Sequence, residues 1–311
     1  MTLGKVMIAA PVHEVLLQGL TDEGYELVRA EKVTQETAFN VIRDCVGVVT
    51  STRLQLDKEL LDTAKKLRWI GRMGSGMEVI DVAYAAGRGI RCFSSPEGNS
   101  NAVAEHAIGM LLSLTKRITW SHGEVKEGKW LRDENRGMEL EGKTIGIIGY
   151  GNTGSAFARK LMGFDVRLLV YDKERKEVPG QITNCEHLSL IQEKADIISF
   201  HVPLKPDTDH YFDQAFLEKM KKPFILVNTS RGKVVDTKVL YEGLKAGKVI
   251  GACLDVLEKE PLDRLEAEEK AMIDAMVEGG KVVVTPHIAG YSHEALYKMS
   301  DIILRKIVMY S

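Results

Sequence analysis

The 311-residue sequence contains no apolar run long enough to cross a membrane as a helix. Its first residues, MTLGKVMIAAPVHEV, include only about six consecutive apolar residues, which is fewer than the core of a secretory signal peptide requires. These absences predict a chain with no membrane partner. They also predict a cytoplasmic location.

Cysteine is scarce, and its spacing carries no motif. The four cysteines are far apart and none belongs to a C-x-x-C pair; they are Cys45, Cys92, Cys185 and Cys253. This spacing argues against both a structural zinc site and a disulfide framework. We therefore predict no metal site, and free thiols again fit a cytoplasmic protein.

Charge of either sign is not in excess. Forty-two basic residues face 44 acidic residues, so the formal net charge is −2. Bulk charge thus gives no reason to expect a nucleic-acid partner or a membrane surface. A composition of 44% hydrophobic and 28% charged residues is typical of a soluble globular protein. The length suggests about two domains.

Short apolar runs alternate with helical patterns along most of the chain. The runs that we predict to be strands are 5–10, 46–50, 90–93, 144–149, 166–171, 197–201, 224–228, 250–255 and 282–285. Strands that alternate with helices indicate crossover units and a parallel sheet. Within each run, apolar residues are continuous, as expected for strands that are covered on both faces. The pattern predicts an α/β fold.

One segment departs from this alternation of strands and helices. Residues 99–118 have apolar side chains at helical spacing, and we predict a helix that links two domains, with Asn99 or Ser100 as its N-cap. The following residues, 119–143, are mostly polar and include two tryptophans. This stretch is either an arm that packs on a second subunit or a long surface loop.

A glycine motif follows the strand predicted at 144–149. Gly149, Gly151 and Gly154 form G-x-G-x-x-G ahead of a helical pattern, and the next strand ends at Asp172. The first glycine allows a tight turn, the second lets a pyrophosphate approach the backbone, and the third lets helix and strand pack closely. The free N–H groups of the helix then face the phosphates.

The acid at the end of the second strand predicts which dinucleotide binds. Asp172 can accept hydrogen bonds from both ribose hydroxyls, and its charge repels a 2′-phosphate, so we predict NAD rather than NADP. Lys173 and Arg175 act weakly in the opposite direction. Six predicted strands between Thr144 and Thr285 match a complete doubly wound dinucleotide domain.

Three consecutive strand ends carry side chains that suit hydride-transfer chemistry. Arg231 follows the strand 224–228, the segment VLEKEP with its acids follows 250–255, and His287 follows 282–285. Ligands of this fold bind beyond the carboxyl ends of the strands. Arginine can hold a carboxylate or polarise a carbonyl, and a histidine backed by a carboxylate can exchange a proton near neutral pH. We predict that His287 is the general acid/base.

These motifs together resemble the D-2-hydroxyacid dehydrogenase family over nearly the whole chain. The matching stretches are 71–90, 98–105, 142–154, 201–204, 228–236, 251–261 and 285–290. The resemblance implies that Arg231, Glu260 and His287 form the catalytic set. Glu260 is chosen among the nearby acids because it directly precedes Pro261 and follows Asp255 by five residues.

The resemblance also implies an architecture. Residues 99–290 are expected to form a doubly wound (Rossmann) NAD-binding domain. Residues 1–98, completed by 291–311, are expected to form a smaller flavodoxin-like substrate-binding domain, with the active site in the cleft. Members of the family are usually dimeric through the region of the arm, so we expect a homodimer.

Further contacts are implied residue by residue. The expected cofactor contacts are Ser75, Gly149, Gly151, Asn152, Thr153, Gly154, Asp172, Val202, Pro203, Thr229, Ser230, Asp255 and Gly290. The expected substrate contacts are Ser51, Arg53, Gly74, Ser75, Gly76 and Arg132. The amides of Gly74 to Gly76 form a nest for the substrate carboxylate. Asp255 either orients the nicotinamide amide or Arg231, which we favour, or satisfies loop amides. His106, His201 and His293 are expected to have structural or surface roles.

The resemblance implies that the substrate is a small 2-hydroxy or 2-oxo acid. Within the family, the chain is most similar to the 3-phosphoglycerate dehydrogenases, on the stretches GNSNAVAE and EGKWLRD and on Arg132. Those enzymes commonly have an arginine where this chain has Ser51; Arg53 has the same strand parity and could replace it. The alternatives are a glyoxylate or hydroxypyruvate reductase and, in another class, an NAD-sensing corepressor.

Overall fold

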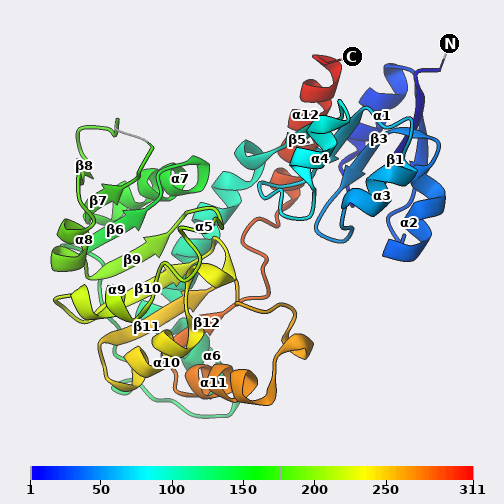
Figure 1. Ribbon diagram of the computed structural model, residues 1–311. Coiled ribbons are helices and arrows are strands. Elements are labelled where there is room, and N and C mark those ends of the chain that lie inside the picture. The colour runs from blue at the N-terminus through cyan, green and yellow to red at the C-terminus, as the bar shows by residue number, and fades with distance from the viewer. Residues whose placement is uncertain (1, 175–176, 311) are drawn as a thin grey trace. The chain divides into compact units, whose positions relative to one another are not determined.

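The computed structural model describes residues 2–174 and 177–310, and its chain divides into two compact units (Figure 1). Unit 1 comprises Met1–Ser100 and Gly290–Ser311, and unit 2 comprises Asn101–Ala289. These bounds lie within two residues of the domain limits expected from the sequence. In the described part of the chain, no helix is both long and apolar enough to cross a membrane.

Unit 1 contains a parallel sheet with the strand order β2-β1-β3-β4-β5. Its strands are β1 (Gly4–Ile8), β2 (Tyr25–Arg29), β3 (Cys45–Thr50), β4 (Trp69–Arg72) and β5 (Arg91–Ser94). Its helices are α1 (Glu14–Asp22), α2 (Gln35–Ile42), α3 (Lys58–Thr63), α4 (Val82–Gly87) and the C-terminal α12 (His293–Val308). The strand order is the flavodoxin-like one, as predicted.

Two strands of unit 1 were missed by the sequence pattern. β2 lies at the sheet edge and only Tyr25 in it is buried, so it shows no continuous apolar run. β4 is fully buried but has only four residues, two of which are Gly71 and Arg72. A continuous apolar run marks only strands that are covered on both faces and long enough to be recognised. The edge position of β2 and the short length of β4 weaken this pattern.

The C-terminal helix α12 belongs to the core of unit 1. Ile303 and Ile307 are fully buried, and Leu304 lies so close to α1 that a side chain at Gly19 would overlap it. The hydroxyl of Ser300 accepts a hydrogen bond from the backbone N–H of His13. Chain segments from both ends of the sequence therefore build this unit.

Unit 2 contains a parallel sheet with the order β12-β11-β10-β9-β6-β7-β8. Its strands are β6 (Thr144–Ile148), β7 (Arg167–Tyr171), β8 (Thr183–Asn184), β9 (Ile197–Phe200), β10 (Phe224–Asn228), β11 (Val249–Leu254) and β12 (Val282–Val284). Its helical segments are α6 (Ile118–Lys126), α7 (Asn152–Leu161), η1 (Met162–Phe164), α8 (Ser189–Lys194), α9 (Gln214–Lys219), η2 (Gly232–Val234), α10 (Thr237–Lys245), η3 (Leu262–Arg264) and α11 (Ala267–Glu278).

The first six strands along the chain, β6 to β11, have the spatial order β8-β7-β6-β9-β10-β11, which is that of the doubly wound dinucleotide fold. The prediction of six strands was one too low, because β8 has only two residues and both are exposed. Successive residues of β10 pack into different core clusters: Phe224 and Leu226 into one, Ile225 and Val227 into the other. The sheet is thus covered on both faces, which explains its continuous apolar strands.

The long helix α5 (Pro96–Thr115) starts and ends three residues earlier than predicted. Pro96 occupies its first position, where the fixed φ of proline suits a helix start. Asn99 and Ser100 therefore lie inside the helix, and the prediction that one of them is the N-cap was wrong. The helix ends near Arg117, whose φ of 55° separates α5 from α6.

Candidate active site

The glycine turn between β6 and α7 has the geometry of a phosphate-binding loop. Gly149 has a φ of 92°, and a Cβ there would lie 2.5 Å from the carbonyl oxygen of His201. A Cβ on Gly154 would lie 2.1 Å from the carbonyl oxygen of Gly149. Gly151, at the N-cap of α7, instead faces open space. Two glycines are thus required by packing, and the third leaves room for a ligand.

The first turn of α7 offers its N–H groups to that space. Asn152 and Thr153 begin the helix, and no side chain caps it. Unsatisfied N–H groups and the helix dipole together favour an anion at this end. The expected phosphate contacts at Gly151, Asn152 and Thr153 are therefore compatible with the local structure.

Asp172 follows β7 and closes the glycine turn from the side. Its Oδ2 accepts a hydrogen bond from the backbone N–H of Tyr150 at 2.6 Å, and its Oδ1 accepts one from the N–H of Glu174 at 2.8 Å. An ionised carboxylate offers about four acceptor sites, so further hydrogen bonds from a ribose remain possible. Lys173 pairs with Asp207 at 2.9 Å, and Arg175 lies outside the described residues.

Two buried polar atoms at the carboxyl ends of β9 and β10 have no partner among the described residues. They are Oγ1 of Thr229, after β10, and Nδ1 of His201, after β9. The other ring nitrogen of His201 lies 2.9 Å from Oγ of Ser199, and burial lowers the pKa of this histidine to about 3. His201 is therefore neutral. The backbone of His201 packs on Gly149, so its unpartnered Nδ1 belongs to a residue of the glycine cradle.

The segment after β9 and the turn after β10 hold the remaining cofactor candidates. Val202 is half-buried, and its Cγ1 would lie 3.0 Å from a Cβ on Gly149, so it packs on the glycine turn; Pro203, which follows it, is exposed. Ser230 donates hydrogen bonds from its N–H and its hydroxyl to Oδ1 of Asn228. The Ser230 side chain is thus engaged in shaping the turn that carries Arg231.

Arg231 is positioned by this turn and by a close backbone contact. The side-chain amide of the fully buried Asn228 donates to the carbonyl oxygen of Arg231 at 2.9 Å. A Cβ on the next residue, Gly232, would lie 1.8 Å from the carbonyl oxygen of Leu257. Only glycine lets the turn lie directly on the loop that leads to Glu260. The Arg231 guanidinium donates to the carbonyl oxygen of Ser230 at 2.7 Å.

Glu260 and His287 form a hydrogen-bonded pair. Oε2 of Glu260 lies 2.7 Å from Nδ1 of His287, and its Oε1 accepts from the N–H of Leu257 at 2.8 Å. Burial acts to raise the pKa of Glu260, but the hydrogen bonds from His287 and Leu257, with the nearby charges of His287 and Arg231, hold it below its usual value.

The same contact changes the basicity of the histidine. The hydrogen bond to Glu260 raises the pKa of His287 against the opposing effects of burial and of the Arg231 charge. The bond also directs Nδ1 toward the carboxylate, which leaves Nε2 without a partner among the described residues. Nε2 is therefore the nitrogen that can exchange a proton with a substrate.

The loop from Thr285 to Ala289 holds His287 in an unusual backbone conformation. His287 has a φ of 55°, a left-handed conformation that costs energy for a residue with a side chain. Its N–H donates to the carbonyl oxygens of Asp255 and Thr285. The Asp255 carboxylate accepts from the N–H groups of Ile288 and Ala289 and, at 2.5 Å, from the hydroxyl of Thr285.

These contacts bear on the two roles that we considered for Asp255. Its side chain is only 1% exposed, and both oxygens accept hydrogen bonds from the loop rather than from Arg231. The alternative expectation, that Asp255 satisfies loop amides, agrees with the structure. A carboxylate at this position holds the backbone of the loop that carries His287.

His106 takes part in the same network, which the sequence did not indicate. Its Nε2 lies 2.9 Å from Oγ1 of Thr285 and 3.5 Å from Oδ1 of Asp255. His106 was expected to have a structural or surface role. Its side chain contacts Thr285, which belongs to the loop that carries His287. No spacing rule connects a helix residue to a loop 179 positions later.

The expected substrate contacts lie in unit 1, except for Arg132. Gly74 has a φ of 138°, and its N–H donates to the hydroxyl of Ser95 at 3.1 Å. The Gly74 amide is thus engaged with Ser95 in this structure, and its expected contact with the substrate carboxylate stays a prediction. Ser75 and Gly76 remain candidates for that role. Arg132 is exposed in the segment after α6.

Ser51 and Arg53 follow β3, whose neighbour β4 leads into the Gly74 loop. Ser51 is half-buried, and Arg53 is exposed with one guanidinium nitrogen 2.7 Å from the carbonyl oxygen of Glu31. The candidate substrate groups thus follow the carboxyl ends of adjacent strands. Gly290, an expected cofactor contact, belongs to unit 1, and a side chain there would overlap Asn99.

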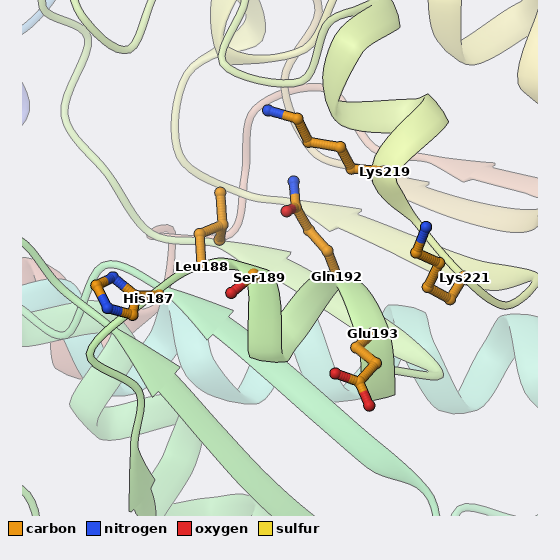
Figure 2. A pocket seen from close by; sticks show the side chains of 7 residues that line it. All are labelled: His187, Leu188, Ser189, Gln192, Glu193, Lys219 and Lys221. Atoms are coloured by element: carbon orange, nitrogen blue, oxygen red, sulfur yellow. The ribbon is translucent and has the colours of Figure 1, made fainter.

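A cavity lies elsewhere in unit 2. It has a volume of about 670 Å³ and is lined by residues of α8 and α9 and their flanks, among them Gln192, Lys219 and Lys221 (Figure 2). The carbonyl oxygen of Gln192 accepts from the N–H of Lys221, just before the amino end of β10. None of its lining residues belongs to the glycine turn or to the Glu260–His287 pair.

Metal ligands are not gathered anywhere in the described residues: no group of three or more His, Cys, Asp or Glu side chains could hold an ion. The four cysteines are unpaired, and three of them are buried. The groups that the fold does bring together are a glycine cradle, an acid at a strand end and an Arg–Glu–His set.

Comparison with known proteins agrees with this set of groups, which suits a nicotinamide-dependent enzyme. Residues 108–289 match the family model described as D-isomer specific 2-hydroxyacid dehydrogenase, NAD binding domain. The chain belongs to this family. Membership assigns it to the NAD-dependent oxidoreductases that act on the hydroxyl group of 2-hydroxy acids, and it confirms the predicted cofactor, NAD.

Individual relatives differ in substrate. The chain is 35% identical to a D-3-phosphoglycerate dehydrogenase of Archaeoglobus fulgidus over 98% of its length, but it spans only 56% of that relative. It is 38% identical to a glyoxylate reductase of Thermofilum pendens, over 88% of this chain and 81% of the relative. A D-lactate dehydrogenase of Aquifex aeolicus, solved with NAD and lactic acid, superposes with a TM-score of 0.84 at 28% identity, covering 98% of this chain and 95% of the other.

Proposed function

We propose that this protein transfers hydride between C2 of a D-2-hydroxy acid and NAD, with His287 as acid/base, Glu260 as its partner and Arg231 as the substrate anchor. The observation that carries the proposal is the 2.7 Å contact between Glu260 and His287. It joins the ends of two strands, β11 and β12, whose carboxyl ends meet at the edge where this fold binds ligands.

The pair supplies the proton chemistry. In oxidation, neutral His287 accepts the substrate hydroxyl proton at Nε2, while its Nδ1–H donates to Glu260 and the developing imidazolium is stabilised by the carboxylate. In reduction, the same Nε2 returns the proton to the ketone oxygen. The raised pKa of His287 favours the protonated form that reduction requires. NAD, held at the glycine turn and by Asp172, would supply the hydride chemistry.

Arg231 supplies positive charge near the reacting groups. Its charge lowers the pKa of both Glu260 and His287, so it acts on each of them electrostatically. A guanidinium there can bind the substrate carboxylate and polarise the C2 carbonyl. We assign the remaining carboxylate contacts to the amides of Ser75 and Gly76.

The substrate that we propose first is D-3-phosphoglycerate, oxidised to phosphohydroxypyruvate. Arg53 follows β3 and is held by Glu31, which follows β2, so its guanidinium is fixed at the carboxyl edge of the unit 1 sheet. One of its five donors is used in that contact, and the others can bind a phosphate. The relative from Archaeoglobus fulgidus supports this substrate.

The second candidate is reduction of glyoxylate or hydroxypyruvate. Ser51 stands where the phosphoglycerate-specific enzymes commonly have arginine, and one guanidinium nitrogen of Arg53 already donates to the carbonyl oxygen of Glu31. A pocket with weaker positive charge suits an unphosphorylated acid. The relative from Thermofilum pendens, a glyoxylate reductase, supports this candidate.

Initial rates of NADH oxidation with phosphohydroxypyruvate, hydroxypyruvate and glyoxylate separate the candidates. We expect phosphohydroxypyruvate to be preferred, and Arg53→Gln to lower kcat/KM for it while leaving hydroxypyruvate unchanged. Arg43→Gln, at an exposed arginine that follows α2, is the matched control. A preference for the unphosphorylated acids that Arg53→Gln does not alter would support the reductase.

His287→Ala tests the reaction class itself. Turnover should fall by on the order of 10³-fold with every acid, whereas the Kd for NADH should stay unchanged, because the histidine acts on the proton and not on the cofactor. Normal turnover in this variant would contradict the proposed role.

We also propose that the protein is a homodimer through the arm, residues 119–143. Several apolar side chains in this arm are exposed: Val125, Trp130 and Leu131. Trp130 is 79% exposed, which is unusual for so large an apolar side chain outside an interface. Sedimentation of the intact protein and of Trp130→Asp should show a dimer and a weakened dimer; a monomeric intact protein would contradict the proposal.

A further inference from the structure

A second histidine–glutamate pair lies beside the catalytic one. Nε2 of His210 is 2.6 Å from Oε1 of Glu258, and Oε2 of Glu258 accepts from the N–H of Thr237 at 2.7 Å. Glu258 is two residues from Glu260 in the loop after β11. One carboxylate thus connects three chain segments: the turn before α9, the start of α10 and the loop that carries Glu260.

Leu257, the residue that precedes Glu258, links both catalytic loops. Its N–H donates to Oε1 of Glu260, and its carbonyl oxygen packs against Gly232, next to Arg231. A shift of the Leu257 backbone would therefore move the hydrogen-bond donor of Glu260 and the support of Arg231 together. Glu258 anchors this backbone on its C-terminal side.

His210 holds the same region from the opposite side. It has a φ of 47°, and its N–H donates to the carbonyl oxygen of Lys233 at 2.6 Å. The neighbouring Phe212 exchanges backbone hydrogen bonds with Val234 and Asp236. The His210 segment is thereby tied to the chain just after Arg231, while its side chain is tied to Glu258. Strained conformations of this kind persist where the surroundings hold them.

The environment of Glu258 suits a fixed anion. Thr237 is the first residue of α10, a helix of nine residues, and its N–H group belongs to the positive end of the helix dipole. Asp236 caps that helix through the N–H of Val239, so the N–H of Thr237 is left for Glu258. Both oxygens of Glu258 are then used by groups that do not take part in the reaction.

We propose that Glu258 and His210 are positioning residues that set the geometry of Glu260 and Arg231. This inference rests on the proposed function, because it takes Arg231, Glu260 and His287 as the reacting set. The pair does not touch the substrate; it fixes the Leu257 backbone, which orients Glu260 and supports the Arg231 turn. Misplacement of a catalytic group by about 1 Å can cost on the order of 10²-fold in rate.

The test compares Glu258→Ala, Glu258→Gln and His210→Asn in the full-length protein. Asparagine tolerates the left-handed backbone of residue 210 but is too short to reach Glu258. We expect kcat to fall roughly 10- to 100-fold in Glu258→Ala and His210→Asn, with an unchanged Kd for NADH. Glutamine at 258 keeps an acceptor for Thr237 and should recover most of the activity. Glu269→Gln, at a neighbouring surface carboxylate paired with Lys259, is the matched control and should behave as the wild type.

Coupling to Glu260 separates positioning from general destabilisation. If Glu258 acts through Glu260, the loss caused by Glu258→Ala should be much smaller in a Glu260→Gln background, and its pH profile should approach that of Glu260→Gln. An equal loss in both backgrounds, or an unchanged kcat, would overturn the inference. If Glu258→Ala does not fold, His210→Asn carries the same comparison.

His287→Ala, measured in parallel, keeps the two proposals distinguishable. Normal turnover in that variant contradicts the proposed function, and the inference falls with it. Loss of turnover in His287→Ala together with normal kcat and pH profile in Glu258→Ala and His210→Asn contradicts the inference alone.

Discussion

Oε2 of Glu260 lies 2.7 Å from Nδ1 of His287, although the two residues are 27 positions apart. The contact raises the pKa of the histidine and, with other hydrogen bonds, lowers that of the glutamate. Each residue thus favours the charged form of the other. The contact also directs Nδ1 toward the carboxylate, so Nε2 is the ring nitrogen that exchanges the proton in the function that we propose.

Glu260→Gln should change the pH dependence of the reaction. Removing the carboxylate charge lowers the pKa of His287, because the hydrogen bond to Glu260 is what raises it. Reduction needs the protonated histidine, so its alkaline limb should move to lower pH; the acid limb of oxidation should move the same way. Profiles of kcat/KM in both directions measure this. An unchanged profile with reduced kcat would indicate a purely steric role.

The same variant should alter how stability depends on pH. His287, with its raised pKa, stabilises the fold at low pH, and this contribution is lost as pH rises through its folded-state value. Glu260, with its lowered pKa, stabilises the fold at high pH, and this contribution is lost as pH falls through its folded-state value. Both are present only between the two pKa values, where the difference in Tm between wild type and Glu260→Gln should be largest. A difference that is constant with pH would contradict this coupling.

Asp255→Asn should release the loop that carries His287. An asparagine has a single oxygen to accept from Thr285, Ile288 and Ala289, and its NH₂ group meets a donor. We expect a loss of about 1–3 kcal/mol in unfolding free energy and a lower kcat. The Kd for NADH should stay near that of the wild type; a large rise in Kd would instead support the role in orienting the nicotinamide. Thr285→Ser, which keeps the hydroxyl, is the control.

Two glycine variants should separate packing from ligand binding. Gly154→Ala places a Cβ 2.1 Å from the Gly149 carbonyl, so α7 must move away from β6 and the Tm should fall. Gly151→Ala meets no protein atom within 4 Å, so its Tm should be unchanged while NADH affinity decreases. Thermal unfolding and NADH titration of both variants test the assignment. Equal losses of Tm would mean that the open space at Gly151 has no role in binding.

Asp172→Ser should weaken the preference for NAD. The substitution removes the charge that repels a 2′-phosphate and an acceptor for the ribose. It also removes the hydrogen bond to the N–H of Tyr150, so the glycine turn should lose some order. The ratio of kcat/KM for NADH to that for NADPH should fall. Asp207→Ser, which breaks the exposed pair with Lys173, serves as the control for charge near the site.

Much of the fold was predictable because its signals are local. The glycine spacing, the acid at the end of β7 and the fully buried strands β6 and β10 are read from neighbouring residues, and the structure places them as expected. The errors occur where local signals are weak. β2 and β8 are edge strands with exposed residues, and the start of α5 lies ahead of its first buried position.

The acids after β11 show where local pattern stops being sufficient. Asp255, Glu258 and Glu260 follow one strand, and their chemistry alone does not assign them roles. Sequence order and residue type were enough to establish the glycine turn, the alternating strands and the presence of an arginine, an acid and a histidine at successive strand ends. The tertiary structure decided the contacts of each acid: Asp255 accepts hydrogen bonds from loop amides, Glu258 contacts His210 and Thr237, and Glu260 contacts His287. Each of these partners comes from a distant segment, and such contacts form only when the strands and loops have packed together.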